Sequence, residues 1–160
     1  MGSLGSGIAA VLFGLAMTGP VAADCAPATV ELRSPVGIAR FHVEVARTAA
    51  EHASGLMFRE KLAASSGMLF VFDPPKHARF WMKNTLIPLD MIFADASGRV
   101  TVVQANAVPQ DTTALDGGDG VAFVLEINGG LAKRLGIAPG VVMRHSLIAQ
   151  DGALWSCSQP

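Results

Sequence analysis

The sequence lacks the short motifs that identify several common enzyme classes. No serine lies in a G-x-S-x-G context, since Ser54-Gly55 is without the first glycine, and the glycine-rich phosphate-binding signatures are absent. The histidines are scattered and form neither an H-x-x-x-H nor an H-x-H pair: His42, His52, His77 and His145. We therefore expect no serine hydrolase, no metal site and no cofactor.

An excess of basic residues is also missing. Lysine and arginine number 12, aspartate and glutamate number 13, and the formal net charge is −1. Binding to a nucleic acid duplex needs clustered basic side chains, so nucleic acid is not expected as the main partner. Charged residues make up only 16% of the chain and aliphatic residues dominate. The chain can therefore bury a sizeable core.

Charged residues and histidine are absent from residues 1–23. An apolar block, Ile8 to Met17, is followed by Gly19-Pro20 and then by small residues up to Ala23. This is the order of a secretory signal, although the usual basic residue at the start is missing. A membrane anchor would need roughly 20 apolar residues, and Pro20 interrupts the run too early. We expect residues 1–23 to be a cleaved export signal and residues 24–160 to be a single globular domain. The mature protein would be periplasmic or extracellular, with no stable membrane span.

Cysteine occurs only twice, at Cys25 and Cys157, near the two ends of the expected mature chain. The termini of compact domains are often close together. In an oxidising compartment the pair would close into a disulfide. The alternative is two free thiols on loose ends. Neither cysteine has a C-x-x-C partner or a neighbouring histidine, which argues against a catalytic or metal-binding thiol.

Alternating and continuous apolar runs predict seven or eight short strands. They cover residues 29–33, 37–45, 67–72, 78–82, 86–94, 99–107, 121–127 and 141–148. Thr48 and Glu51 form a capping box that predicts a short helix, and Asn128 is the expected N-cap of a second one. Residues 108–120 read as a long loop. The fold class is therefore α+β, mainly antiparallel β, with a closed or half-closed barrel-like sheet and two short helices.

Polar residues interrupt the apolar run from Phe80 to Phe93, F-W-M-K-N-T-L-I-P-L-D-M-I-F. They are Lys83, Asn84, Thr85 and Asp90. Burying such groups costs free energy unless they are paired or hydrogen-bonded. They either brace the fold or face a pocket.

Three blocks together resemble a known family: G-L-M-F-R (55–59), the stretch from Gly67 to Phe93, and F-V-L-E-I-N-G-G (123–130). The resemblance, over about residues 41–144, is to the uncharacterised bacterial and archaeal family catalogued as domain of unknown function 192. It implies a single, mainly β domain that is often exported, and no established enzymatic activity. The candidate ligand-binding residues within the matching blocks are Arg59, Trp81, Lys83, Asn84, Thr85, Asp90 and Glu126.

Two interpretations of these residues stay open. In the first they form a pocket, with Trp81 as an aromatic wall, Lys83 or Arg59 binding an anion, and Asp90 or Glu126 acting as a base. In the second they brace the structure, with Lys83 paired to Asp90 or Glu126 and Arg59 paired to the other acid.

Three functional hypotheses follow. The leading one is an exported, non-enzymatic protein that binds a small molecule or an envelope protein through the polar cluster beside Trp81. The first alternative is a hydrolase- or lyase-type enzyme that uses Asp90 or Glu126 as base together with Lys83. The second alternative is a purely structural envelope factor.

Overall fold

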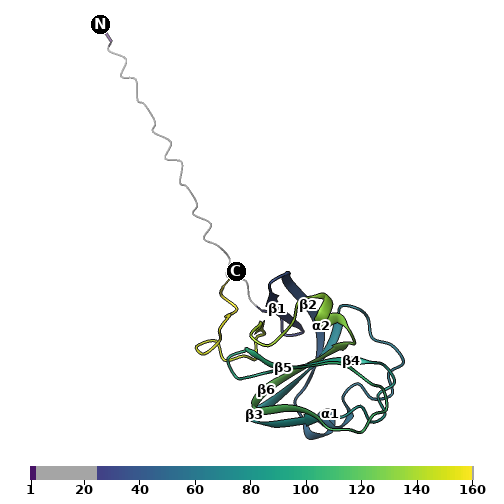
Figure 1. The fold of residues 1–160 in the computed structure, drawn as a ribbon. Coiled ribbons are helices and arrows are strands. Elements are labelled where there is room, and N and C mark those ends of the chain that lie inside the picture. The colour runs from purple at the N-terminus through teal and green to yellow at the C-terminus, as the bar shows by residue number, and fades with distance from the viewer. Residues whose placement is uncertain (3–24, 160) are drawn as a thin grey trace.

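The structure is a computed structural model that describes residues 1–2 and 25–159, so the expected export signal lies almost entirely outside the described residues. One seven-stranded sheet has the order β5-β4-β6-β3-β2-β1-β7 (Figure 1). Only β2 and β3 pair in parallel. The strands are β1 (Thr29–Ser34), β2 (Gly37–Ala46), β3 (Ser66–Phe80), β4 (Leu89–Ala94), β5 (Val100–Ala107), β6 (Leu115–Asn128) and β7 (Val142–Arg144). The helices are α1 (Ala49–Ser54) and α2 (Leu131–Arg134).

The two edges of the sheet meet. A bridge pairs Arg99, just before β5, with Val142 of β7. The N–H of Val100 donates to Val141 O over 2.8 Å, and the N–H of Met143 donates to Gly98 O over 2.7 Å. The sheet therefore curls into a barrel-like shape. This confirms the α+β fold with a barrel-like, mostly antiparallel sheet.

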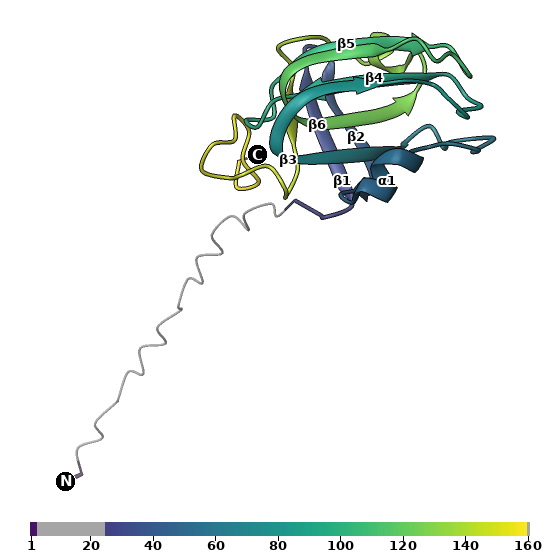
Figure 2. The ribbon, with the colours of Figure 1, turned by 90° about the horizontal axis from the view of Figure 1, so that it is seen from below.

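Two apolar cores lie on opposite faces of β3, β4 and β6, because successive side chains of a strand point to opposite sides. The first core contains Leu69, Ile92 and Leu125 and packs against β1, β2 and α2. The second core contains Phe70, Met91, Phe93 and Val124 and includes Leu56, which follows α1. Figure 2 shows α1 beside β3, and Leu56 connects the end of α1 to this second core.

The capping box predicted at Thr48 is confirmed. The N–H of Glu51 donates to Thr48 Oγ1 over 3.2 Å, and the N–H of Thr48 donates to Glu51 Oε2 over 2.8 Å. The reciprocal bonds satisfy donors that a helix N-terminus leaves free. They fix the direction in which α1 leaves β2.

Two strand predictions were wrong. Residues 67–72 and 78–82 were expected as separate strands, but β3 runs on from Ser66 to Phe80. Its pairing with β6 shifts register between Val71 and Lys76, so the prolines at 74 and 75 fall where no ladder bond is required. The expected loop from 108 to 120 ends early, because β6 begins at Leu115. A Cβ at Gly117 would lie 2.0 Å from Phe93 Cδ1, so glycine is what lets this part of β6 lie on that ring.

The expected cap of α2 was also wrong. The N-cap is Gly130, with φ of 80°, instead of Asn128. The Asn128 side chain donates to the carbonyl oxygens of Leu62 and Ala63 over 3.0 and 3.1 Å. The Asn128 side chain therefore holds the segment before β3. The N–H groups at the start of α2 donate instead to Asp90 of β4, as described below.

Cys25 and Cys157 form a disulfide with a Cα–Cα distance of 5.2 Å, which confirms that prediction. Near this bond two guanidinium groups lie on the buried indole of Trp155, with Arg33 Cζ 4.1 Å and Arg144 Cζ 3.9 Å from the ring centroid. Arg144 is in turn ion-paired with Glu31. The C-terminal segment is thus attached to β1 and β7. Neither described helix is long enough to cross a membrane.

Candidate functional site

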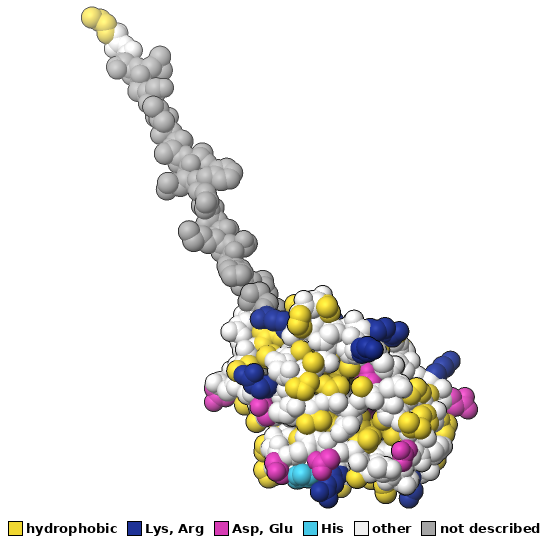
Figure 3. All heavy atoms as spheres, in the orientation of Figure 1, with side chains coloured by type: hydrophobic (Ala, Val, Ile, Leu, Met, Phe, Trp, Pro, Cys, Tyr) yellow, Lys and Arg dark blue, Asp and Glu magenta, His cyan; other side chains and the backbone are white. Residues whose placement is uncertain are grey.

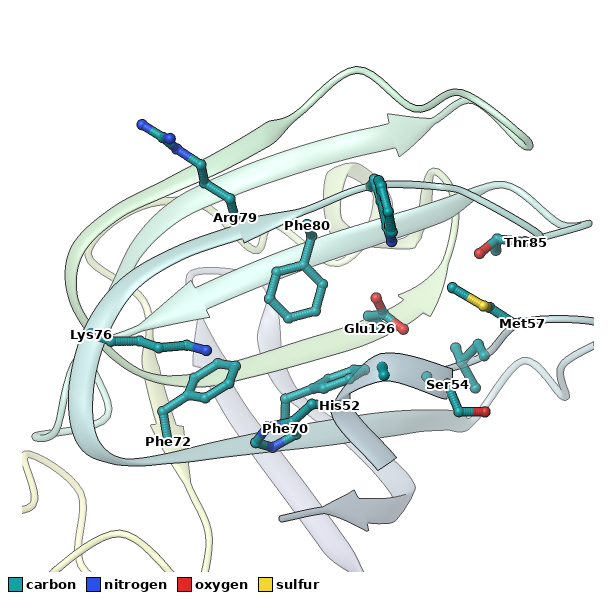
Figure 4. A pocket seen from close by; sticks show the side chains of 14 residues that line it. His52, Ser54, Met57, Phe70, Phe72, Lys76, Arg79, Phe80, Thr85 and Glu126 are labelled. Carbon is teal, nitrogen blue, oxygen red and sulfur yellow. The ribbon is translucent and has the colours of Figure 1, made fainter. Parts of the chain in front are cut away.

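A cavity of about 120 Å³ lies between α1, β3 and the C-terminal end of β6 (Figure 4). We call it the Glu126 pocket. Its wall includes Leu56, Phe70, Phe72, Phe80, Trp81 and Glu126. The lining residues come from three parts of the chain far apart in sequence. The barrel brings them together because β3 is the direct neighbour of β6.

Glu126 is the buried acid of this pocket. It lies on the second-core face of β6, and its two cross-strand neighbours are Met68 of β3 and Met91 of β4. The residue is 4% exposed, and among residues 25–159 its carboxyl group has no hydrogen bond or ion pair. The loss of solvation raises the pKa of the Glu126 carboxyl from 4.5 to about 8. The group is therefore mostly protonated at neutral pH.

Aromatic rings form one side of the pocket. Phe80 stands edge-on to Phe70 with ring centroids 5.0 Å apart, and it meets Phe72 at 6.4 Å. Figure 4 shows these three rings on one side of the Glu126 carboxyl group. Trp81 is 49% exposed, which is unusual for so large an apolar side chain. The pocket thus combines an apolar interior with an indole that solvent reaches.

Helix α1 approaches this wall closely at Gly55. A Cβ at this position would lie 3.2 Å from Phe70 Cζ and 3.9 Å from Glu126 Oε2, and the φ of 49° disfavours larger residues. The absence of a side chain keeps space in front of the carboxyl group. Gly55 therefore helps to shape the pocket as well as to end the helix.

The loops that carry the lining residues Met57, Trp81 and Thr85, and the β5–β6 loop bonded to them, contain residues with positive φ. Phe58, Asn84 and Gln110 are non-glycine residues with φ of 62°, 55° and 66°. The N–H of Phe58 donates to Asn84 O over 2.8 Å, and the N–H of Gln110 donates to Thr85 O over 3.2 Å. Such conformations cost about 1–3 kcal/mol each and cluster at functional sites. The hydrogen bonds of Phe58 and Gln110 hold these loops together beside the pocket.

Three of the seven sequence candidates line the pocket: Trp81, Thr85 and Glu126. Thr85 is buried, and its hydroxyl donates to Lys83 O over 3.3 Å. Arg59, Lys83, Asn84 and Asp90 are not among the lining residues. The structure therefore brings only three of the seven candidates together in one pocket.

The ion pairs that the bracing interpretation predicted are not formed among the described residues. Arg59 binds Glu44 through two bonds of 2.6 Å instead of binding Asp90 or Glu126. Lys83 is exposed, and its Nζ lies 5.2 Å from the centroid of the Trp81 ring. The Asn84 side chain lies 3.9 Å from Met57 Sδ. The partners of Arg59 and Asn84 come from other segments of the chain, so the local sequence does not reveal them.

Asp90 is fully buried and holds backbone in place. Its carboxylate accepts from the N–H of Asn106 over 2.6 Å, of Gly130 over 2.9 Å and of Ala132 over 2.7 Å. Two of these donors belong to the start of α2, so Asp90 supplies the acceptor that α2 lacks in its own sequence. Asp90 therefore ties β4 to β5 and α2.

We expect Asp90→Asn to lower the free energy of unfolding by about 3 kcal/mol or more. The amide keeps one acceptor oxygen and turns an NH₂ group toward buried N–H donors, so bonds to a charged acceptor are lost. Urea unfolding at neutral pH measures the change, with the exposed Asp151→Asn as the matched control. A loss below about 1 kcal/mol would contradict this role.

Sequence reasoning did not single out several lining residues, among them His52, Phe70, Phe72, Lys76 and Phe80. A signal for two of them was present. Phe70 and Phe72 are two residues apart in a strand, so they had to share a face. Lys76 lies beyond the prolines of β3, and only the continuation of that strand brings it back to the same wall. Among the described residues no three His, Cys, Asp or Glu side chains gather as a metal site.

The chain matches the family model of DUF192, described as "Uncharacterized ACR", over residues 30–145. No curated protein matches it. A protein of unknown function from Novosphingobium aromaticivorans is similar in structure, with a TM-score of 0.71 and 50% identity, covering 72% of this chain and 82% of that one. A putative transcription regulator from Sinorhizobium meliloti has a TM-score of 0.70 and 38% identity, covering 78% of this chain and 96% of that one. Since the family match spans most of the chain, this protein belongs to the DUF192 family.

Proposed function

We propose that this protein is exported and binds a small molecule in the Glu126 pocket. One observation carries the proposal: an acid that is 4% exposed faces a cavity and has no hydrogen bond or ion pair among residues 25–159. Among the described residues no fully enclosed side-chain nitrogen or oxygen lacks a hydrogen bond, so the unbonded carboxyl oxygens of Glu126 are reached from the cavity and can take a partner there. A ligand that bonds to the carboxyl group supplies that partner.

The size of the cavity limits the ligand. Its volume of about 120 Å³ lies below the roughly 300–1,000 Å³ of ordinary ligand pockets. Such a space holds a compact molecule or the head group of a larger one. The half-exposed Trp81 at the pocket offers contact area for a part of the ligand that extends toward solvent.

Two observations are compatible with export. The Cys25–Cys157 disulfide is a bond that persists in oxidising compartments. The described helices, of six and four residues, are too short to anchor the chain in a bilayer.

On the face seen in Figure 3 basic and acidic side chains are interspersed, and the net charge is −1. This distribution supports a small-molecule partner over nucleic acid.

An enzyme remains the second candidate, because a carboxyl group with a pKa near 8 suits a general acid or base at neutral pH. The mechanism differs from the one expected from sequence. Asp90 is bonded to three backbone N–H groups, and Lys83 does not line the pocket, so Glu126 would act without either. Unchanged turnover of an ester, glycoside or lactone in Glu126→Gln would exclude it.

A ligand screen with matched variants tests the binding proposal. Small cationic, anionic and neutral molecules are tested by thermal shift against the wild type, Glu126→Gln and the exposed control Glu60→Gln. We expect at least one compound to stabilise the wild type and the control alike and to bind at least about tenfold more weakly to Glu126→Gln. Changes in the NMR chemical shifts of the Gly55 amide and the Trp81 indole would locate the bound compound in the pocket. If no compound binds, or if Glu126→Gln binds equally well, the proposal fails.

A further inference from the structure

We propose that the ligand of the Glu126 pocket carries an ammonium group, which lies between the Glu126 carboxylate and the faces of the aromatic side chains. The inference rests on the proposed function and names its ligand class. It follows from three features of the described residues: the missing counter-ion of Glu126, the nature of the wall, and the places where the nearby cations are already engaged.

The first feature is that no Lys, Arg or His side chain of residues 25–159 pairs with Glu126. Arg59 is bound to Glu44, and Arg79 lies 3.2 Å from Asp116. Lys76 and Lys83 lie on aromatic rings. The cations nearest to the pocket are therefore all used elsewhere, and among the described residues the acid is left without a counter-ion. A cation from outside fits this position.

The second feature is that rings of this pocket already bind ammonium groups. Lys76 Nζ lies 4.0 Å from the centroid of the Phe72 ring, and Lys83 Nζ lies 5.2 Å from that of Trp81. The face of an aromatic ring attracts cations through its quadrupole, by about 0.5–2 kcal/mol per contact. Phe70 and Phe80 also line the pocket, and among the described residues no lysine or arginine lies on their rings, so beside the carboxyl group they offer a cation the same attraction.

The third feature concerns anions. The two cationic lining residues, Lys76 and Arg79, are exposed and belong to β3 beyond the register shift. Figure 4 shows them away from Glu126, with the aromatic rings in between. An anion bound at these cations would make no use of the acid, and the ionised form of Glu126 and the negative ring faces would repel an anion placed beside them. The geometry around Glu126 thus favours a positively charged group.

Binding of an ammonium group is coupled to the charge of Glu126. A quaternary ammonium keeps its charge at every pH, so it reports only on the protein. The free carboxyl group is largely protonated at pH 7, and the cation binds its ionised form. Binding therefore releases nearly one proton at pH 7, and affinity rises up to about tenfold per pH unit below pH 8 and levels off above it.

Other titratable groups face the same pocket and need a control. They are His52 of α1, whose Nε2 lies 3.1 Å from Ala46 O, and the two cations Lys76 and Arg79 of β3. Protonation of His52 would repel a bound cation and would act in the same direction as Glu126. The variant His52→Gln removes that contribution, so the pH dependence that persists in it belongs to Glu126.

Calorimetric titration with tetramethylammonium and choline tests the inference, and 3,3-dimethylbutan-1-ol serves as the uncharged counterpart of choline. We expect choline to bind at least about tenfold more tightly than the alcohol at pH 8.5, with proton release at pH 7 and a loss of about tenfold or more in Glu126→Gln. Trp81→Leu should weaken binding as well, and Glu60→Gln should not.

The outcomes separate the two proposals. If the screen finds an anionic or neutral ligand that depends on Glu126 while neither ammonium compound binds, the ligand class is wrong and the binding function stands. Equal binding of choline and the alcohol, or binding that does not change between pH 6 and pH 8.5, would also overturn the ammonium assignment. If no compound of any charge binds, both proposals fail.

Discussion

Replacing Glu126 with glutamine is expected to stabilise the protein at pH 8 and to leave its stability nearly unchanged at pH 5. The folded state holds the proton of this acid up to about pH 8, whereas the unfolded chain releases it near 4.5. Between these values the unfolded state binds fewer protons, so the free energy of unfolding of the wild type falls as pH rises. The interval corresponds to roughly 5 kcal/mol at ~1.4 kcal/mol per pH unit, as an upper bound.

Urea unfolding across this pH range measures the effect in three proteins: wild type, Glu126→Gln and Glu60→Gln. The curves of the wild type and Glu60→Gln should fall together, and the Glu126→Gln curve should separate from them progressively above about pH 5. If all three curves run parallel, Glu126 has an ordinary pKa and is not desolvated as described. This experiment also bears on the hypothesis of a purely structural protein, which expects every truncation in the polar cluster to destabilise the fold.

The fold could be predicted because its signals are local. Alternation of apolar residues marked β1 and β2, and Thr48 with Glu51 marked the start of α1. The disulfide followed from two cysteines near the chain ends. In each case the deciding interaction lies within a few residues or follows from the compactness of a domain. The loop predicted over residues 115–120 was wrong because the strand there depends on a non-local contact, the close approach of Gly117 to the Phe93 ring.

The candidate site could be predicted only in part, and the acids show why. Asp90 and Glu126 look alike in sequence, since each is a single carboxylate in an apolar strand. Asp90 meets three backbone N–H groups because the sheet places α2 and β5 beside it. Glu126 meets two methionines and a cavity. The register of β4 and β6 places Asp90 where its carboxylate is bonded to the backbone and Glu126 where its carboxyl group faces the cavity.

Opening the Cys25–Cys157 disulfide is expected to lower the free energy of unfolding by about 5 kcal/mol. The cysteines are 132 residues apart, so the bond closes nearly all of the described domain into one loop. In the chain-entropy model such a cross-link restricts the unfolded chain by ~4.7 kcal/mol for a loop of about 100 residues and slightly more for a longer one. The folded barrel itself should persist, since its sheet does not include either cysteine.

Urea unfolding of the oxidised protein and of the double variant Cys25→Ser/Cys157→Ser measures this difference. The fluorescence of Trp155, which is buried in contact with Arg33 and Arg144, distinguishes a global effect from a local one. A global effect lowers the midpoint of the whole transition while the native spectrum stays the same. If only Trp155 changes and the midpoint does not, the bond merely fastens the C-terminal segment, and the constraint on the unfolded chain is refuted. A full loss of about 5 kcal/mol would leave little of the 5–15 kcal/mol that usually stabilises a domain, so the protein would depend on a compartment that keeps the bond oxidised.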